Sequence, residues 1–303
     1  MTLLGVLVGG TIALLMSGCV SAPVSRQFTA GSSQAHTPTT SPTSDYTAAA
    51  KHLEKSREFL KNRDFKAALA EVEQAEHLIG SQVPENQAYV RVLIEKAGVF
   101  AYFEHLDEAE ATLLQATGIP TNKIRTLSNS RQWMTEEQHR DIADELQELV
   151  ASDDKSGYHV ALSYIYNILG DTQRMEEQQQ LAMDASEIGD ITVDIAMALY
   201  KVGGRKIDVH ANLMQQEALA QSDPESPDVQ LRLGYAYHLA GWFAEAEGVA
   251  DKWIVRVDKE QDKDLYVLFL SLKMNVAMSQ GQYAQMKHYE AEVLEIDPHA
   301  FDE

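Results

Sequence analysis

The chain has 303 residues, a mass of 33.7 kDa and a net charge of -21, with 45% hydrophobic and 23% charged residues. This is the balance of a globular protein that buries a sizeable core. Its single cysteine excludes a disulfide scaffold and a multi-cysteine metal site. Its acidity argues against nucleic-acid binding, which needs Lys and Arg side chains against the phosphates.

The chain begins with an uncharged, mostly apolar run from Leu3 to Met16. At ~1.5 Å per residue this run reaches ~21 Å, which is too short for a ~30 Å hydrocarbon core but typical of a signal peptide. The run ends in Leu-Met-Ser-Gly-Cys at residues 15–19, which resembles the lipobox of bacterial lipoproteins. The resemblance implies that residues 1–18 are a signal peptide and that Cys19 is acylated. The alternative is that residues 1–19 form an uncleaved anchor or a buried helix.

The residues around Cys19 also indicate a location. Val20, rather than Asp, follows the cysteine, which by resemblance to lipoprotein sorting signals implies the outer membrane and a domain that faces the periplasm. The segment from Val20 to Asp45 holds 11 Ser or Thr residues and three Pro residues. Such a composition does not support a packed core, so residues 19–45 are predicted to be a disordered, lipid-anchored tether.

After Asp45 the apolar residues recur every three and four positions, which is helical periodicity. Two helix starts carry recognisable caps. Thr135 followed by Gln138 predicts a capping box, and Ser226 followed by Pro227 predicts an N-cap with proline at the first helical position. We therefore predict an all-α domain over residues 46–303.

Internal repeats are clearest over residues 227–260. The spacing is that of one 34-residue helical hairpin. The apolar Leu233 and the small Gly234 are followed by the aromatic Tyr237 and by the turn glycine Gly241. A second aromatic residue, Phe243, and two further small residues, Ala246 and Ala250, complete the pattern. The pattern resembles the tetratricopeptide (TPR) repeat family. Small residues at the positions of Gly234 and Ala246 let the two helices of a hairpin approach closely.

The same pattern gives four further repeats, over residues 49–82, 90–123, 156–189 and 267–300. The long gaps between them predict degenerate repeats at about residues 126–150 and 192–225. Together they predict an α-solenoid of stacked helical hairpins, a TPR-like superhelix of about seven helix pairs.

Candidate catalytic motifs do not meet their requirements. A Glu-x-x-His occurs once, ending at His139, whereas a di-iron bundle needs two; we predict that His139 is an exposed residue in the first turn of a helix. Gly203 and Gly204, beside Arg205 and Lys206, are predicted to form a tight turn between helices rather than a phosphate loop. The sequence predicts no enzyme, no metal site and no cofactor.

In the TPR family, set positions of each first helix line a concave groove that binds peptides. Carried onto this chain, the resemblance implies the following groove residues: Arg57, Leu60, Lys61, Arg91, Ile94, Tyr102, Tyr164, Asn167, Ile168, Leu231, Tyr235, His238, Asn275 and Met278. Some of them, Ile94 and Ile168 above all, have the alternative role of packing between helices. The predicted partners are envelope proteins bound in the groove, together with the membrane bound through the lipid.

The function predicted is that of an envelope-anchored scaffold or adaptor, in the assembly of a pilus or secretion machine or in the control of cell-wall enzymes. The alternative is an enzyme or ligand-binding receptor with its site in the degenerate repeats between residues 126 and 225. A cluster of buried titratable residues there favours the alternative, whereas a continuous groove favours the adaptor.

Overall fold

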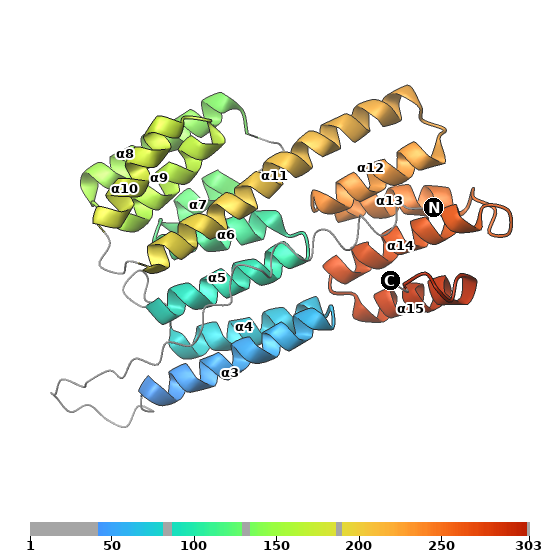
Figure 1. Cartoon of the computed structure of the whole chain (residues 1–303), viewed down its shortest axis with the longest axis horizontal. Helices are drawn as coiled ribbons and strands as arrows, with labels where there is room; N and C mark the ends of the chain where they lie inside the picture. The colour runs from blue at the N-terminus through green and yellow to red at the C-terminus, as the bar shows by residue number, and fades with distance from the viewer. Residues whose placement is uncertain (1–41, 81–86, 129–133, 186–189, 302–303) are drawn as a thin grey trace.

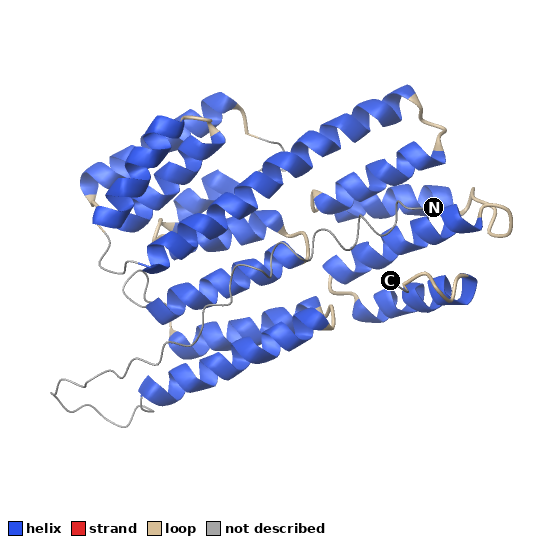
Figure 2. Cartoon of the chain, viewed as in Figure 1, coloured by secondary structure: helices blue, strands red, loops and turns tan. Residues whose placement is uncertain are grey.

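The computed structural model describes residues 42–80, 87–128, 134–185 and 190–301. In these residues the fold is all helical, without a strand (Figure 2). The helices are α3 (Pro42–Lys61), α4 (Phe65–Ile79), α5 (Gln87–Tyr102), α6 (Leu106–Ala116), α7 (Thr121–Ser128), α8 (Glu136–Ser152), α9 (Ser156–Ile168), α10 (Thr172–Asp184), α11 (Asp190–Ser222), α12 (Pro227–Leu239), α13 (Phe243–Ile254), α14 (Lys263–Ser279) and α15 (Tyr283–Ile296). The expected fold class is therefore confirmed at the level of packed, consecutive helices.

Five helical hairpins have the same turn. These are α3–α4, α5–α6, α9–α10, α12–α13 and α14–α15. Each turn has one residue with positive φ, and these residues are Arg63 (58°), Glu104 (66°), Gly170 (71°), Gly241 (74°) and Gly281 (67°). In each turn the N–H of that residue donates to the carbonyl three residues earlier, and the next N–H donates to the carbonyl five residues earlier. This is the Schellman motif, and its recurrence shows that the five hairpins are copies of one local structure.

The close approach between helices follows the predicted small residues. Ala68, Ala109 and Ala246 are fully buried at the start of the second helices. A Cβ atom at Gly234 in α12 would lie 2.5 Å from Leu272 Cδ2 and 3.2 Å from Val249 Cγ1. Glycine at this position is therefore required by packing, because a Cβ atom under 3.0 Å from a neighbour forces that neighbour to move.

The predicted helix starts are observed. Thr135 and Gln138 make the reciprocal bonds of a capping box at the start of α8. Ser226 caps α12 by accepting a hydrogen bond from the N–H of Val229, with Pro227 at the first helical position. The helical part begins earlier than expected, since α3 starts at Pro42 and takes in the last four residues of the range assigned to the tether.

The middle of the chain departs from the expected hairpins. Residues 190–222 form one continuous helix, α11, so the predicted turn at Gly203 and Gly204 is wrong. The N-terminal half of α11 packs against α5, α6 and α9 through Ile191, Ile195 and Leu199. Its C-terminal half packs against α12 through Leu213 and Ala220. This one helix therefore belongs to both halves of the molecule, and α8–α10 form a group of their own beside it (Figure 1).

The two halves of the chain also meet directly. In Figure 1 the stack α3–α6 lies beside the stack α12–α15, with α11 running across from one to the other. We call the junction of their turns the seam; it comprises residues 61–66, 101–106, 238–243 and 278–283. The ring of His105 stacks on Phe65 with centroids 4.8 Å apart and lies 5.1 Å from the ring of Phe243. The repeat chain therefore folds back so that the turns of its first and last hairpins touch.

Candidate functional site

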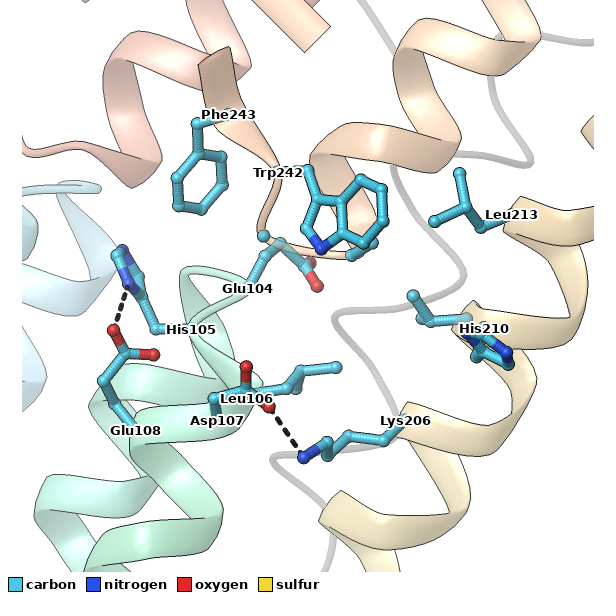
Figure 3. A pocket seen from close by; sticks show the side chains of 13 residues that line it. Glu104, His105, Leu106, Asp107, Glu108, Lys206, His210, Leu213, Trp242 and Phe243 are labelled. Carbon is cyan, nitrogen blue, oxygen red and sulfur yellow. Dashed lines mark ion pairs between the residues drawn. The ribbon is translucent and has the colours of Figure 1, made fainter. Parts of the chain in front are cut away.

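A cleft of about 320 Å³ opens on the seam, between the α5–α6 turn, the middle of α11 and the α12–α13 turn. Figure 3 shows its charged lining, with Asp107 and Glu108 on one side and Lys206 and His210 on α11 opposite, and the rings of Trp242 and Phe243 on a third side. The cleft is therefore formed by three segments that are far apart in the sequence and that the shared helix α11 brings together.

Glu104 connects the α5–α6 turn to α11. Its side chain forms an ion pair with Arg205, whose Nη1 also donates to the carbonyl of Ala101 at 2.7 Å. Both charged side chains are largely buried. Burial raises the pKa of Glu104 to about 7, although the Arg205 guanidinium opposes that shift. The backbone of Glu104 has positive φ, which costs a residue with a side chain about 1 kcal/mol; the bond to Arg205 is the contact that a glycine here would lack.

Two histidines connect the other side of the seam. His105 Nε2 donates to the carbonyl of Ser279 at 2.7 Å, and His105 Nδ1 lies 3.6 Å from Glu108 Oε1. Burial lowers the pKa of His105, but the Glu108 carboxylate and the Ser279 carbonyl outweigh burial and raise it overall. His238 is buried, with Nε2 3.0 Å from Ser279 Oγ, and burial lowers its pKa to about 4. Protonation is therefore favoured on the ring of His105 and disfavoured on the ring of His238.

A second buried network lies at the floor of the cleft. Lys206 Nζ is 2.7 Å from Asp107 Oδ1 and 2.7 Å from Glu110 Oε2, and the hydroxyl of Tyr164 donates to Glu110 Oε1. Burial lowers the pKa of Lys206, but the two carboxylates outweigh burial and raise it. Burial also raises the pKa of Tyr164 well above its usual value, with Glu110 adding to the effect.

Gly203 explains how the Tyr164 ring fits beside α11. A Cβ atom at Gly203 would lie 2.4 Å from Tyr164 Cε2 and 2.7 Å from its hydroxyl oxygen, whereas one at Gly204 would meet nothing within 4 Å. The first glycine of the pair is thus a packing requirement inside a helix. Sequence reasoning found the pair but gave it the wrong role.

The charged side chains of the cleft largely pair with one another. Lys206 is shared by two carboxylates, and Glu104 is bonded to Arg205. In the described ranges no group of three or more His, Cys, Asp or Glu residues is placed to hold a metal ion.

The predicted groove residues fall into three groups by exposure. The three cations at the N-terminal end, Arg57, Lys61 and Arg91, are exposed on α3 and α5, and Arg57 pairs with Glu95 across these two helices. Leu60 and Leu231 are buried, and the remaining half-buried ones are Ile94, Tyr102, Asn167, Ile168, Tyr235, Asn275 and Met278.

The structure corrects four predicted groove residues, because Leu60, Leu231, Tyr164 and His238 are all buried. Tyr164 is 1% exposed and His238 is 6% exposed, so neither lines an open groove. Tyr164 is covered by α11 and His238 by the seam. His139, expected to be exposed, is also buried, with Nδ1 3.1 Å from the carbonyl of Thr135. Tyr164 and His238 are covered by contacts between distant segments, which the repeat pattern does not encode.

The signal peptide, Cys19 and the tether up to residue 41 lie outside the described residues. Among the residues described, no helix combines the length and the apolar character needed to cross a bilayer.

Sequence reasoning missed Glu104, Arg205 and His105. The one available signal was the position of Glu104 itself, since three of the five repeats have glycine in that turn position. Comparison of the chain with protein-family models and with curated proteins found no match.

Proposed function

We propose that this chain is a lipid-anchored, protein-binding scaffold of TPR-like helical hairpins, held in the outer membrane of a bacterium through acylated Cys19 and facing the periplasm. The observation that supports it best is the five-fold recurrence of one hairpin with the same Schellman turn, with a fully buried alanine at the start of the second helix in three of the five. Repeated hairpins of this kind present extended surfaces, which such proteins use to bind other proteins.

The partner surface is the outer side of α3 and α5, which we call the N-terminal face; it comprises Leu53, Arg57, Lys61, Arg91, Ile94, Gly98 and Tyr102. Its cations are exposed in a chain with a net charge of -21. A Cβ atom at Gly98 would meet nothing within 4 Å, so the surface is open at its middle. Three cations around half-buried apolar side chains suit an extended partner segment that carries both carboxylates and apolar residues.

The face is tested by reversing its charge. We expect Arg57→Glu, Lys61→Glu and Arg91→Glu together to abolish co-purification of the partner from detergent-solubilised membranes. The matched control reverses three exposed cations at the other end of the chain, Lys252, Arg256 and Lys259, with the same change in net charge. Equal loss of the partner in both triple variants would show that net charge, not this face, matters.

The anchor needs its own test. Cys19→Ser in the full chain should move the protein from the membrane to the soluble periplasmic fraction and remove labelling by a palmitate analogue. A Cys19→Ser protein that stays in the membrane would contradict the lipid anchor.

A second candidate function is a small-molecule receptor, favoured by the buried Lys206, Glu110 and Tyr164 network beside the cleft. Such a receptor would retain a low-molecular-mass ligand, visible by native mass spectrometry of the protein isolated from its own cells. Replacement of the cleft residue Trp242 by Ala should then release that ligand while leaving capture of the protein partner intact.

A further inference from the structure

The side of α11 that faces away from the protein carries an apolar stripe. We call it the α11 stripe; it comprises Val193, Met197, Gly204, Ile207, Ala211, Met214 and Ala218. Val193 is 44% exposed, Met197 53%, Ile207 36% and Met214 59%. The other side of the same helix is buried against α5, α6, α9 and α12. An exposed apolar face of this extent on one helix points to a binding surface.

The spacing of the stripe is that of an interface between two paired helices. With Tyr200 included, the residues follow one another in alternating steps of four and three, the a and d positions of a heptad. Tyr200 is half-buried because its hydroxyl donates to Ser163 Oγ and accepts a bond from Gln179. The α11 stripe, which runs from Val193 to Ala218, is therefore about 38 Å long at ~1.5 Å per residue.

We propose that the α11 stripe pairs with the α11 stripe of a second copy of this chain, antiparallel and about a two-fold axis near the middle of the helix. With Met197 opposite Met214 of the second copy, Gly204 lies opposite Ile207 of that copy. In the same register Ala211 lies opposite Tyr200, and Ala218 opposite Val193. Small residues thus meet large ones, which two close-packed helices require.

Glycine at position 204 fits this pairing. Within one copy nothing demands it, since its backbone is helical and a Cβ atom would meet nothing within 4 Å. Glycine inside a helix costs about 1 kcal/mol relative to alanine. In the antiparallel pair the missing side chain leaves room for Ile207 of the second copy.

Charges beside the stripe agree with the same register. Lys201 and Asp208 are exposed, flank the stripe on one side, and have no ion-pair partner among the described residues. In the antiparallel pair, Lys201 of each copy lies opposite Asp208 of the other. A parallel pair would instead separate Lys201 of each copy from Asp208 of the other, and would stack the small residues on one another.

The expected dimer is modest in strength. Two helices in contact over ~38 Å bury on the order of 1,000 Å², at the low end of specific interfaces. We therefore expect a dissociation constant in the micromolar range. A net charge of -21 on each copy repels the other, so the association should be measured at about 0.2 M salt, where exposed charges are screened.

The experiment is sedimentation of the full chain between about 1 and 100 µM. We expect a monomer-dimer equilibrium, and only monomer for Met197→Glu with Met214→Glu; both sites are exposed, so the melting temperature should stay unchanged. Lys201→Asp alone and Asp208→Lys alone should each weaken the dimer about tenfold. The two together should restore it. A monomer at all concentrations, or no rescue by the double charge swap, would overturn the proposal.

Disulfide cross-linking gives the orientation. Met197→Cys with Met214→Cys should form a cross-linked dimer on oxidation, while each single variant and the unmodified chain, whose single cysteine is Cys19, should not. Efficient cross-linking of Met197→Cys to itself would indicate a parallel pair and overturn the antiparallel register.

Discussion

Two adjacent glycines in α11 should respond to the same substitution with opposite signs. Alanine at either position gains about 1 kcal/mol of helix propensity over glycine. At position 204 nothing within one copy of the chain opposes that gain, because a Cβ atom there meets nothing within 4 Å, and the gain is therefore measured at concentrations where the chain is monomeric. We therefore expect Gly204→Ala to stabilise the protein by about 1 kcal/mol, a rise of about 2–4 °C in melting temperature for a domain of this size.

At position 203 a Cβ atom would lie 2.4 Å from the ring of Tyr164. Overpacking of this kind costs about 1–3 kcal/mol. Displacement of the ring also strains the hydrogen bond from Tyr164 to the buried carboxylate of Glu110, a charge-assisted bond of about 1.5–3 kcal/mol. After the gain in propensity is subtracted, Gly203→Ala should destabilise the protein by about 2–4 kcal/mol.

Thermal melts of the two variants, followed by far-UV circular dichroism, measure both effects, and near-UV dichroism reports on the tyrosine environment. If both variants were stabilised, the packing of Tyr164 on Gly203 would be refuted. If both were destabilised alike, as expected for two glycines in a turn, the continuous helix α11 would be refuted.

Three further predictions concern the seam and the cleft. Arg63→Gly should stabilise the protein by about 0.5–1 kcal/mol, because glycine adopts positive φ without strain. Glu104→Gly should instead destabilise it by about 1–2 kcal/mol, because it also removes the ion-pair partner of Arg205. Equal shifts in the melting temperatures of the two variants would contradict this difference. Because burial lowers the pKa of His238 from 6.5 to about 4, the folded state binds fewer protons there than the unfolded state, and stability should fall as pH falls from about 6.5 to 4. In urea titrations, the free energy of unfolding of His238→Gln should therefore fall by up to about 3 kcal/mol less than that of the unmodified protein over this pH range. A variant with the same pH dependence as the unmodified protein would refute the buried neutral imidazole. Lys206→Met should cost about 3 kcal/mol by leaving the carboxylate of Glu110 without its cation, and adding Glu110→Gln should recover most of that loss in the same titrations.

The sequence predicts the hairpins well because their determinants are local. A Schellman turn and a pair of small residues at fixed spacing leave a signature within 34 residues, as at Gly241, Gly234 and Ala246. Capping residues such as Thr135 are equally local. Such features need no knowledge of what the hairpin later packs against.

The long helix α11 and the seam depend on contacts between residues that are far apart in the sequence. Gly203 and Gly204 suggest a turn because glycine commonly ends helices. In the structure, however, Gly203 lies inside a helix, where a larger residue would collide with the ring of Tyr164, a residue distant in the sequence. Tyr164 and His238 occupy groove positions of their repeats, but α11 and the seam cover them. The exposed Arg57, Lys61 and Arg91 escape this because the helices that pack against α3 and α5, α11 included, leave these three side chains uncovered.

The scaffold proposal is tested most directly by photo-cross-linking in cells that produce the lipid-anchored full chain. Photo-reactive residues would replace Lys61 and Arg91 on the N-terminal face, and Glu73 and Gln74, which are exposed on α4, as controls. The proposal predicts one defined envelope protein cross-linked from the first two positions and none from the controls. Cross-links that are equal from both sets, or absent from both, would contradict it.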